Sequence, residues 1–210
     1  MMILEVFPGG PYQTNTILLG CSETKQAAVI DPSQNIFSSV IAEANNQGLK
    51  ITKILLTHSH WDHIADVAIF KDKLAIPVYV HAKDAENLKK PGADGLPKHF
   101  SIRGVKPDYL LEDKQQLHVG NLLLEVMHTP GHSPGGVCFY LPEQNTLISG
   151  DTLFKGSFGN TSFPTSNQKD MIASLKKLSR LPGSTLVVPG HGGKTTIQNE
   201  SWLERAEQFF

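Results

Sequence analysis

Short runs of Val, Ile and Leu recur along the whole chain, and most of them end in Gly, Pro, Asp or His. Apolar runs of this length, bounded by turn-forming residues, predict β-strands. Nine such strands are predicted, at residues 2–7, 14–20, 27–32, 51–58, 76–82, 121–130, 135–142, 145–151 and 184–192. Strands therefore dominate both halves of the chain.

Apolar residues at helical spacing lie between some of these strands. They predict helices at 36–44, at 64–74 directly after His63, at 171–178, and in a last short segment from Thr195 onward. Strands with interspersed helices favour a layered α/β domain with its sheets in the middle. Because 210 residues suffice for one large core, we expect residues 1–210 to form a single domain.

Residues 89–106 depart from this pattern, because they are rich in Gly and Pro and carry scattered charge. We interpret them as a long loop, and long ordered loops in compact domains often serve function. The loop is therefore predicted to border a substrate cleft. Its basic residues are candidates for contacts with substrate carboxylates, and they are Lys89, Lys90, Lys98 and Arg103.

The charge balance excludes some classes of function. Lys plus Arg number 19 and Asp plus Glu number 20, so the net charge of −1 gives no support to nucleic-acid or membrane-surface binding. No apolar run approaches the roughly 18 residues that span a bilayer, and the first residues do not resemble a signal peptide. The two cysteines, Cys21 and Cys138, are interpreted as unpaired thiols. We expect a cytoplasmic protein.

The densest chemical signal is the segment THSHWDH, which directly follows the apolar residues 53–56. In an extended segment His58 and His60 point to the same side and can bind one metal ion together. Asp62 and His63 follow where the chain is expected to turn into a helix, so their side chains should diverge toward a second position. Imidazole nitrogen and carboxylate oxygen suit zinc, iron or manganese. A lone histidine would more often be structural, but this density of ligand types predicts metal binding.

Four ligands in one segment cannot complete two sites, and three further segments offer more. Each closes an apolar strand and contains a Gly that lets the backbone turn beside the polar residue. They are TPGH ending at His132, SGD ending at Asp151 and PGHG around His191. Strand ends at one edge of a sheet would bring all of them together.

The series THSHWDH, TPGHS, SGDTLF and PGHG, in this order over residues 13–200, resembles the metallo-β-lactamase superfamily, and within it the single-domain glyoxalase II-like hydrolases. The resemblance implies the four-layered αββα sandwich, with a two-metal site at one edge of the sheets. It further implies one metal held by His58, His60 and His132, a second held by Asp62, His63 and His191, and Asp151 between the two. The cofactors expected are two divalent metal ions, zinc first, with iron or manganese as alternatives.

Two kinds of residue beside these ligands need an interpretation. Asp31 resembles the acidic residue that supports the ligands in this family, although an Asp before Pro is equally typical of a turn. The remaining histidines match no ligand position and are interpreted as structural or surface residues, namely His81, His99, His118 and His128.

Two adjacent metal ions make hydroxide available at neutral pH, because metal binding lowers the pKa of water to about 7. A metal-bridging hydroxide is therefore the expected nucleophile, and Asp62 is the expected catalytic residue that orients it. A thiolate, whose conjugate acid has a pKa of about 8.5, departs without a general acid, whereas an amide nitrogen would need one. The expected partner is a small-molecule acyl thioester such as hydroxyacylglutathione.

The sequence also departs from the glyoxalase II pattern. The full glyoxalase II enzymes hold glutathione with a Lys and a Tyr after the GDTLF segment, where this chain has Asn160 and Ser162. These enzymes also carry a C-terminal helical domain, whereas only 19 residues follow His191 here. Two alternatives stay open. One is a mononuclear-iron persulfide dioxygenase, with iron at the positions of His58, His132 and Asp151. The other is a lactonase on the same fold.

Overall fold

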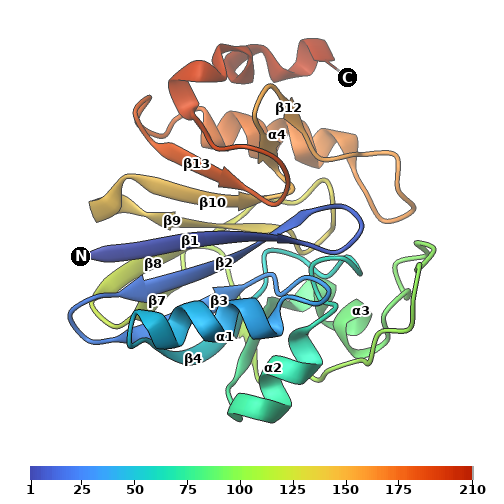
Figure 1. The fold of residues 1–210 in the computed structure, drawn as a ribbon. Helices are drawn as coiled ribbons and strands as arrows, with labels where there is room; N and C mark the ends of the chain where they lie inside the picture. The colour runs from blue at the N-terminus through green and yellow to red at the C-terminus, as the bar shows by residue number, and fades with distance from the viewer. Residues whose placement is uncertain (210) are drawn as a thin grey trace.

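Two six-stranded β-sheets form the middle of the molecule, which the structure, a computed structural model, describes from residue 1 to residue 209 (Figure 1). The first sheet has the order β1-β2-β3-β4-β5-β6. Strands β1 to β3 pair antiparallel, and β3 to β6 pair parallel. The bounds are β1 Met2–Gly9, β2 Thr14–Cys21, β3 Gln26–Ile30, β4 Lys50–Leu55, β5 Val78–His81 and β6 Tyr109–Leu111.

The second sheet has the order β14-β13-β10-β9-β8-β7, and only its β10–β13 pair is parallel. Because β9 is antiparallel to both of its neighbours, β8, β10 and β13 all run in the same direction. The bounds are β7 Gln116–Val119, β8 Leu122–His128, β9 Val137–Leu141, β10 Thr146–Gly150, β13 Leu186–Pro189 and β14 Thr195–Thr196. A small hairpin, β11 Leu153–Phe154 with β12 Ser157–Phe158, forms a separate two-stranded sheet.

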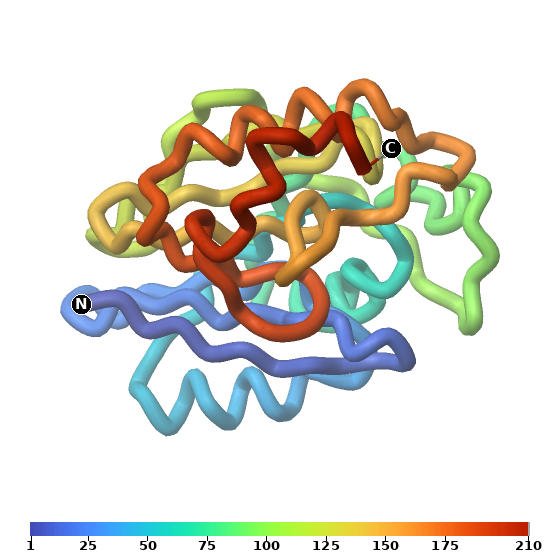
Figure 2. Tube along the Cα trace, turned by 90° about the horizontal axis from the view of Figure 1, so that it is seen from above, coloured from blue at the N-terminus to red at the C-terminus, as the bar shows by residue number. Residues whose placement is uncertain are grey.

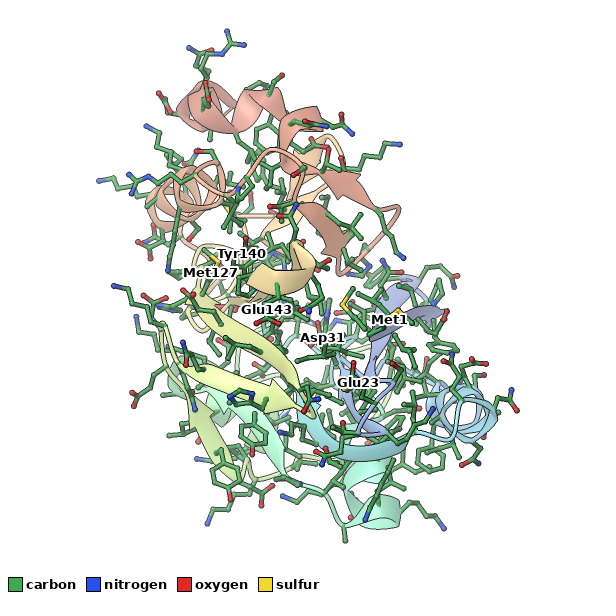
Figure 3. The ribbon with its side chains drawn as sticks, turned by 90° about the vertical axis from the view of Figure 1, so that its left-hand side faces the viewer. Met1, Glu23, Asp31, Met127, Tyr140 and Glu143 are labelled. Atoms are coloured by element: carbon green, nitrogen blue, oxygen red, sulfur yellow. The ribbon has the colours of Figure 1, made fainter. Side chains whose placement is uncertain are left out.

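The two sheets pack face to face through alternate apolar side chains. Ile17 and Ile30 of the first sheet meet Val126, Phe139 and Ile148 of the second in one buried cluster. Strand alternation sends the intervening residues to the outer faces, where helices cover them. Figure 3 shows Met127 and Tyr140 on the side of the second sheet that faces the C-terminal helical layer, and both belong to the cluster there.

Helices form the two outer layers. Helix α1 (Phe37–Asn46) and α2 (Val67–Leu74) pack on the first sheet, and α4 (Gln168–Leu178) packs on the second (Figure 1). The C-terminal 3₁₀ segments, Ile197–Asn199 and Ser201–Phe209, lie beside α4 (Figure 2). The predicted four-layered αββα sandwich is therefore confirmed. None of the described helices has the length and apolar character needed to cross a membrane.

All nine predicted strands form, but the structure corrects several helical boundaries. Residues 61–66, which include the end of the histidine motif, form turns. Helix α2 therefore begins at Val67 rather than directly after His63. The last segment, predicted to be helical from Thr195, begins with the strand β14 and continues as 3₁₀ helix, with a non-helical residue at Arg205. A short 3₁₀ turn (Ala82–Asp84) and α3 (Ala85–Lys89), which the apolar pattern did not predict, precede the long loop at 90–108.

Candidate metal centre

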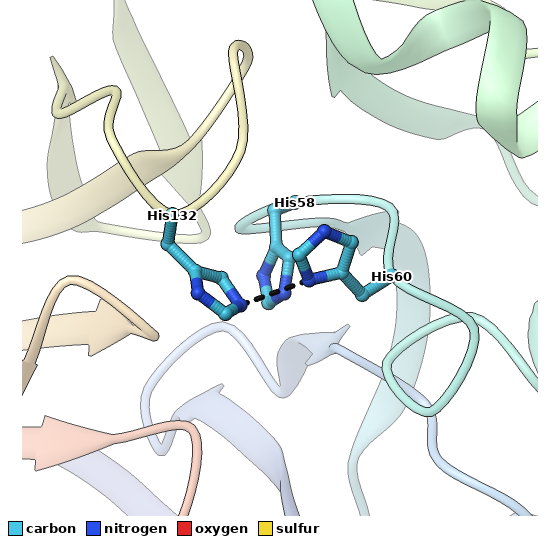
Figure 4. Close-up of side chains that lie close together, drawn as sticks. All are labelled: His58, His60 and His132. Carbon is cyan, nitrogen blue, oxygen red and sulfur yellow. Dashed lines mark hydrogen bonds between the residues drawn. The ribbon is translucent and has the colours of Figure 1, made fainter. Parts of the chain in front are cut away.

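The seven candidate ligands all follow carboxyl ends of strands. The segment with His58, His60, Asp62 and His63 follows β4, while His132, Asp151 and His191 follow β8, β10 and β13. Because β8, β10 and β13 run in one direction, their carboxyl ends share one edge of the second sheet, and the end of β4 meets them there. The structure thus brings all seven together, and three of them lie in the view of Figure 4.

His58, His60 and His132 form the first cluster, all three buried (Figure 4). The Nδ1 of His60 lies 2.8 Å from the Nε2 of His132. One nitrogen from each of the three rings lies within 4.8 Å of the others. Three imidazole nitrogens at this mutual spacing could hold one divalent cation.

Asp62, His63 and His191 form the second cluster, with a ligand atom of each again within 4.8 Å of the others. The carboxylate of Asp151 lies between the clusters. Its Oδ2 is 3.4 Å from His132 Nε2 and 3.4 Å from His191 Nε2, and its Oδ1 is 3.4 Å from His63 Nε2. Asp151 is therefore placed to contact a cation in either cluster.

The second ring nitrogen is occupied in four of the five histidines. The Nδ1 of His63 lies 3.0 Å from Asp31 Oδ2, that of His132 lies 2.8 Å from the carbonyl of Asn160, and that of His191 lies 3.0 Å from the carbonyl of Tyr12. A carboxylate or carbonyl at Nδ1 keeps the proton there and leaves the Nε2 lone pair for a metal.

His58 follows the same logic through Thr57. The Thr57 hydroxyl donates to Asp31 Oδ2, so its oxygen can accept the Nδ1 proton of His58 at 3.1 Å. The structure therefore favours the supporting role of Asp31, which accepts from the Thr57 N–H at 2.8 Å and also contacts His63. The Asp31 side chain is buried and lies near the middle of the molecule (Figure 3). Asp31 is therefore more than a turn residue.

The electrostatics of the two clusters suit cations. Burial lowers the pKa of His58 well below its usual value and that of His60 to about 3, so both stay neutral and keep a lone pair. In the second cluster, burial lowers the pKa of His63, but the carboxylates of Asp62 and Asp151 outweigh it and raise that pKa well above its usual value. These carboxylates therefore favour positive charge at the second position.

Three buried polar atoms of the candidate ligand residues lack any hydrogen-bond partner among the described residues: His58 Nε2, His60 Nε2 and Asp151 Oδ1. Buried polar atoms are normally satisfied, so a cluster of unsatisfied ones requires an explanation. Donor types, burial and these unsatisfied atoms together fit a pair of divalent cations. The donor set is compatible with zinc, iron or manganese.

The start of β2 holds the second cluster in place, a role that no sequence motif indicates. The Thr14 hydroxyl donates to Asp62 Oδ2 at 2.7 Å. The Asn15 side-chain amide donates to the carbonyls of Pro189 and Gly192, on either side of His191. Both residues lie in a strand that reads as ordinary β structure, so only the folded chain reveals their contacts.

A cleft of about 460 Å³ opens over both clusters. Three of its residues, Leu96, Pro97 and His99, come from the 90–108 loop, so the prediction that this loop borders the cleft is confirmed. Aromatic side chains form much of its wall. The Trp61 ring contacts the rings of Tyr12 and His99, with centroids 5.2 and 5.1 Å away, and those two rings also contact each other. The lining side chains outside the ligand set are Tyr12, Trp61, Leu96, Pro97, His99, Phe154, Asn160 and Phe163.

The basic residues of the loop do not reach this cleft. Arg103 pairs with Asp72 at 2.5 Å, Lys90 pairs with Glu86 at 3.1 Å, and the ammonium group of Lys98 bonds to the carbonyl of Pro91. None of the four basic side chains lines the cleft. The idea that they replace glutathione contacts is therefore not supported by their positions. Asn160 does line the cleft, whereas Ser162 does not.

The four histidines outside the ligand set occupy different environments. His99 is exposed, as its interpretation as a surface residue predicts, and it also lines the cleft and contacts the Tyr12 hydroxyl at 3.1 Å. His118 is exposed. His81 and His128 stack with ring centroids 4.1 Å apart and planes 9° from parallel. Both cysteines are buried and unpaired, as predicted.

The stacked pair predicts a dependence of stability on pH. Burial, followed by the charge of His128, lowers the pKa of His81 from 6.5 to about 4. The unfolded chain therefore binds a proton between pH 6.5 and 4 that the folded chain does not, and stability falls as the pH drops through this window. Replacing His81 by Asn keeps an acceptor for the Lys83 N–H and removes the titration.

Urea unfolding at pH 7 and pH 4.5 should show the parent losing about 1 kcal/mol more than His81→Asn, a value reduced because the ring is half exposed. Equal losses in the two proteins would contradict this explanation of the stacked pair.

Known proteins resemble this chain over nearly its whole length. Residues 9–191 match the family described as the metallo-beta-lactamase superfamily. The probable metallo-hydrolase YqgX of Bacillus subtilis is 35% identical over 196 residues, which cover 92% of each chain. The hydroxyacylglutathione hydrolase GloC of Haemophilus influenzae is 31% identical over 206 residues, which cover 95% of each chain.

Solved structures agree with this likeness. The B3 metallo-beta-lactamase BLEG-1 superposes with a TM-score of 0.87 at 37% identity, covering 94% of this chain and 96% of that one. TTHA1623, solved in a di-iron-bound form, superposes with a TM-score of 0.82 at 38% identity and the same coverage. A hydroxyacylglutathione hydrolase and a B3 metallo-beta-lactamase are both among these similar proteins, so the likeness shows the fold and the family more sharply than the substrate.

Proposed function

The chain belongs to the metallo-beta-lactamase superfamily and is a metallo-hydrolase of that family, and we propose that it hydrolyses acyl thioesters at a site for two divalent metal ions. The proposal assigns His58, His60 and His132 to one metal and Asp62, His63 and His191 to the other, with Asp151 between them. It includes hydroxyacylglutathione among the substrates to be tested, because one relative is named as a hydrolase of that compound.

The metal-binding part of the proposal rests on the orientation of the histidine rings. Oxygen atoms of the chain occupy Nδ1 in His58, His63, His132 and His191, so each Nε2 lone pair is left for a cation. Two bound divalent cations would polarise a substrate carbonyl and lower the pKa of water.

Asp62 is the residue proposed to orient the attacking water. Burial raises its pKa, but the charge of His63 and hydrogen bonds to its carboxylate outweigh burial and hold it at about 2, so the group is ionised at neutral pH. The Thr14 hydroxyl fixes Oδ2 at 2.7 Å. An ionised carboxylate in a fixed position can accept a hydrogen bond from the attacking water and so orient it.

The cleft has few polar side chains besides the proposed ligands. Its polar side chains outside the proposed ligands are Tyr12, His99 and Asn160, and the first two contact each other at 3.1 Å. The carboxamide oxygen of Asn160 accepts from the Ser162 N–H, so its amide hydrogens are the donors left for a substrate carbonyl. A thiolate leaves without protonation, which favours thioesters over amides and lactams.

The test compares three substrate classes on one preparation. Hydroxyacylglutathione and a neutral thioester of similar size should release thiol, and a chelator should abolish both reactions. A β-lactam should be cleaved at least about a hundred-fold more slowly, because its nitrogen needs a proton donor.

Two outcomes would overturn the thioester proposal. One is faster cleavage of the lactam or of a lactone than of either thioester. The other is one tightly held iron per chain together with oxygen uptake on a persulfide, which would establish the dioxygenase alternative.

A further inference from the structure

Two buried polar side chains outside the ligand set reach the histidine motif from the turn after β5. Asp84 and Asn87 are 3% and 7% exposed, and they belong to the short 3₁₀ turn and α3 that lead into the 90–108 loop. Both contact Ser59, which lies between His58 and His60 but offers no metal ligand itself. Their position at the carboxyl end of β5 places them at the same edge as the clusters.

Asp84 connects the two chain segments that carry the first cluster. Its Oδ2 accepts from the Ser59 N–H at 2.9 Å and from the Ser133 hydroxyl at 3.0 Å, and its Oδ1 accepts from the Gly135 N–H at 2.6 Å. Ser133 directly follows His132. One carboxylate therefore spans from the segment of His58 and His60 to the segment of His132.

The fit around this carboxylate is close. A Cβ at Gly135 would lie 2.5 Å from Asp84 Oδ1, so the backbone approaches as near as a glycine allows. Burial raises the pKa of Asp84, and the three hydrogen bonds oppose that rise. A buried carboxylate is costly unless donors satisfy it, and here its donors come from the segments that carry the ligands.

Asn87 connects the same serine to the cleft loop. Its Nδ2 donates to the Ser59 carbonyl at 2.6 Å and to Asp94 Oδ2 at 2.9 Å. Its Oδ1 accepts from the N–H groups of Gly92 and Asp94 at 2.9 and 3.2 Å. Residues 92–94 begin the loop that further on supplies Leu96, Pro97 and His99 to the cleft wall.

We propose that Asp84 and Asn87 are positioning residues of the metal centre and its cleft. Asp84 sets the separation between His132 and the His58–His60 pair, and Asn87 fixes the cleft loop against the same backbone. The inference rests on the proposed metal site but not on the choice of substrate. Groups that orient metal ligands typically change metal affinity by 10–100-fold when they are replaced.

The experiment for Asp84 measures zinc affinity on folded protein by competition with a chromophoric chelator. Asp84→Asn should weaken one of the two zinc equivalents by 10–100-fold and leave the other within about three-fold. Asp108→Asn is the matched control, because Asp108 accepts from the Val78 N–H at the opposite end of β5 and also pairs with Lys71. It should lower the melting temperature without changing either zinc affinity.

Ser133→Ala keeps the proposal testable if Asp84→Asn does not fold, because it removes only one hydroxyl donor. It should weaken the same zinc equivalent by a few-fold. Unchanged affinity for both equivalents in the Asp84 variant, or in Ser133→Ala if that variant alone folds, would overturn the role of Asp84. An equal loss in Asp108→Asn would also overturn it. Zinc binding can be measured whether or not any thioester is hydrolysed, so failure of the substrate proposal remains distinguishable.

The experiment for Asn87 measures amide hydrogen exchange in residues 92–99. Asn87→Ala should raise exchange there at least about ten-fold, raise KM for any hydrolysed substrate more than it lowers kcat, and leave zinc affinity within a few-fold. Exchange as slow as in the parent would overturn its role in holding the loop.

Discussion

Replacing His132 with Ala is expected to lower kcat by about a thousand-fold and to remove one equivalent of metal. His132 Nε2 lies 2.8 Å from His60 Nδ1 and 3.4 Å from Asp151 Oδ2, so it joins the first cluster to the carboxylate between the clusters. A cation held by the two remaining histidines would lose both affinity and orientation. A metal supplies several kcal/mol of charge stabilisation in the transition state, which corresponds to a loss of this size.

The matched control is His118→Ala, because His118 is exposed and outside both clusters. This variant should keep two equivalents of metal and activity within a few-fold of the parent. If the two variants had the same metal content and the same rate, the assignment of His132 as a ligand would be wrong.

Replacing Gly190 with Ala is expected to cost at least about a hundred-fold in kcat while the protein still folds. A Cβ at this position would lie 2.1 Å from Asp151 Oδ1 and 2.8 Å from His63 Cε1, so the carboxylate or the strand end must move. Displacements of about 1 Å in a reacting site cost activity on this scale. The Gly190 N–H also bonds to the Gly150 carbonyl at 2.8 Å, which ties the two strand ends together.

Gly193→Ala serves as the control from the same segment. A Cβ there meets nothing within 4 Å, and the residue has no left-handed φ. Its metal content and kcat should match those of the parent. A Gly190→Ala protein with parental activity would show that the close approach to Asp151 does not matter for function.

The strands were predictable because apolar residues dominate them. All nine predicted strands formed, since each carries apolar residues that belong to a core cluster or pack against one. The strands that the pattern missed are short or polar, such as β6 with exposed Tyr109 and Leu110, and β14 with only two residues. Their strand character comes from pairing with a neighbour, which no local pattern records.

The helix after His63 shows a different limit. Ile64 carries the helical spacing, yet residues 61–66 form turns because His63 N bonds to His60 O and Asp66 N bonds to Pro32 O. The Asp66 carboxylate also accepts from the N–H groups of Ile36 and Phe37 at the start of α1. Contacts between distant segments thus override the local spacing that predicted a longer helix.

The ligand candidates could be found from sequence because their residue types are distinctive and each follows an apolar strand. The groups that support these ligands could not be found from sequence. Thr14, Asn15, Asp84 and Asn87 are ordinary polar residues, and only the convergence of strand ends gives them partners in the site. The place of His99 in the cleft wall could not be predicted for the same reason, because its position beside Trp61 depends on the path of the long loop.

The most direct test of the account is anomalous X-ray diffraction from crystals of protein purified without added metal, recorded at the absorption edges of zinc, iron and manganese. We expect two anomalous peaks, one within bonding distance of His58, His60 and His132 and the other within bonding distance of Asp62, His63 and His191, with Asp151 in contact with both. A single peak at saturating metal, or peaks away from these residues, would contradict the two-metal site.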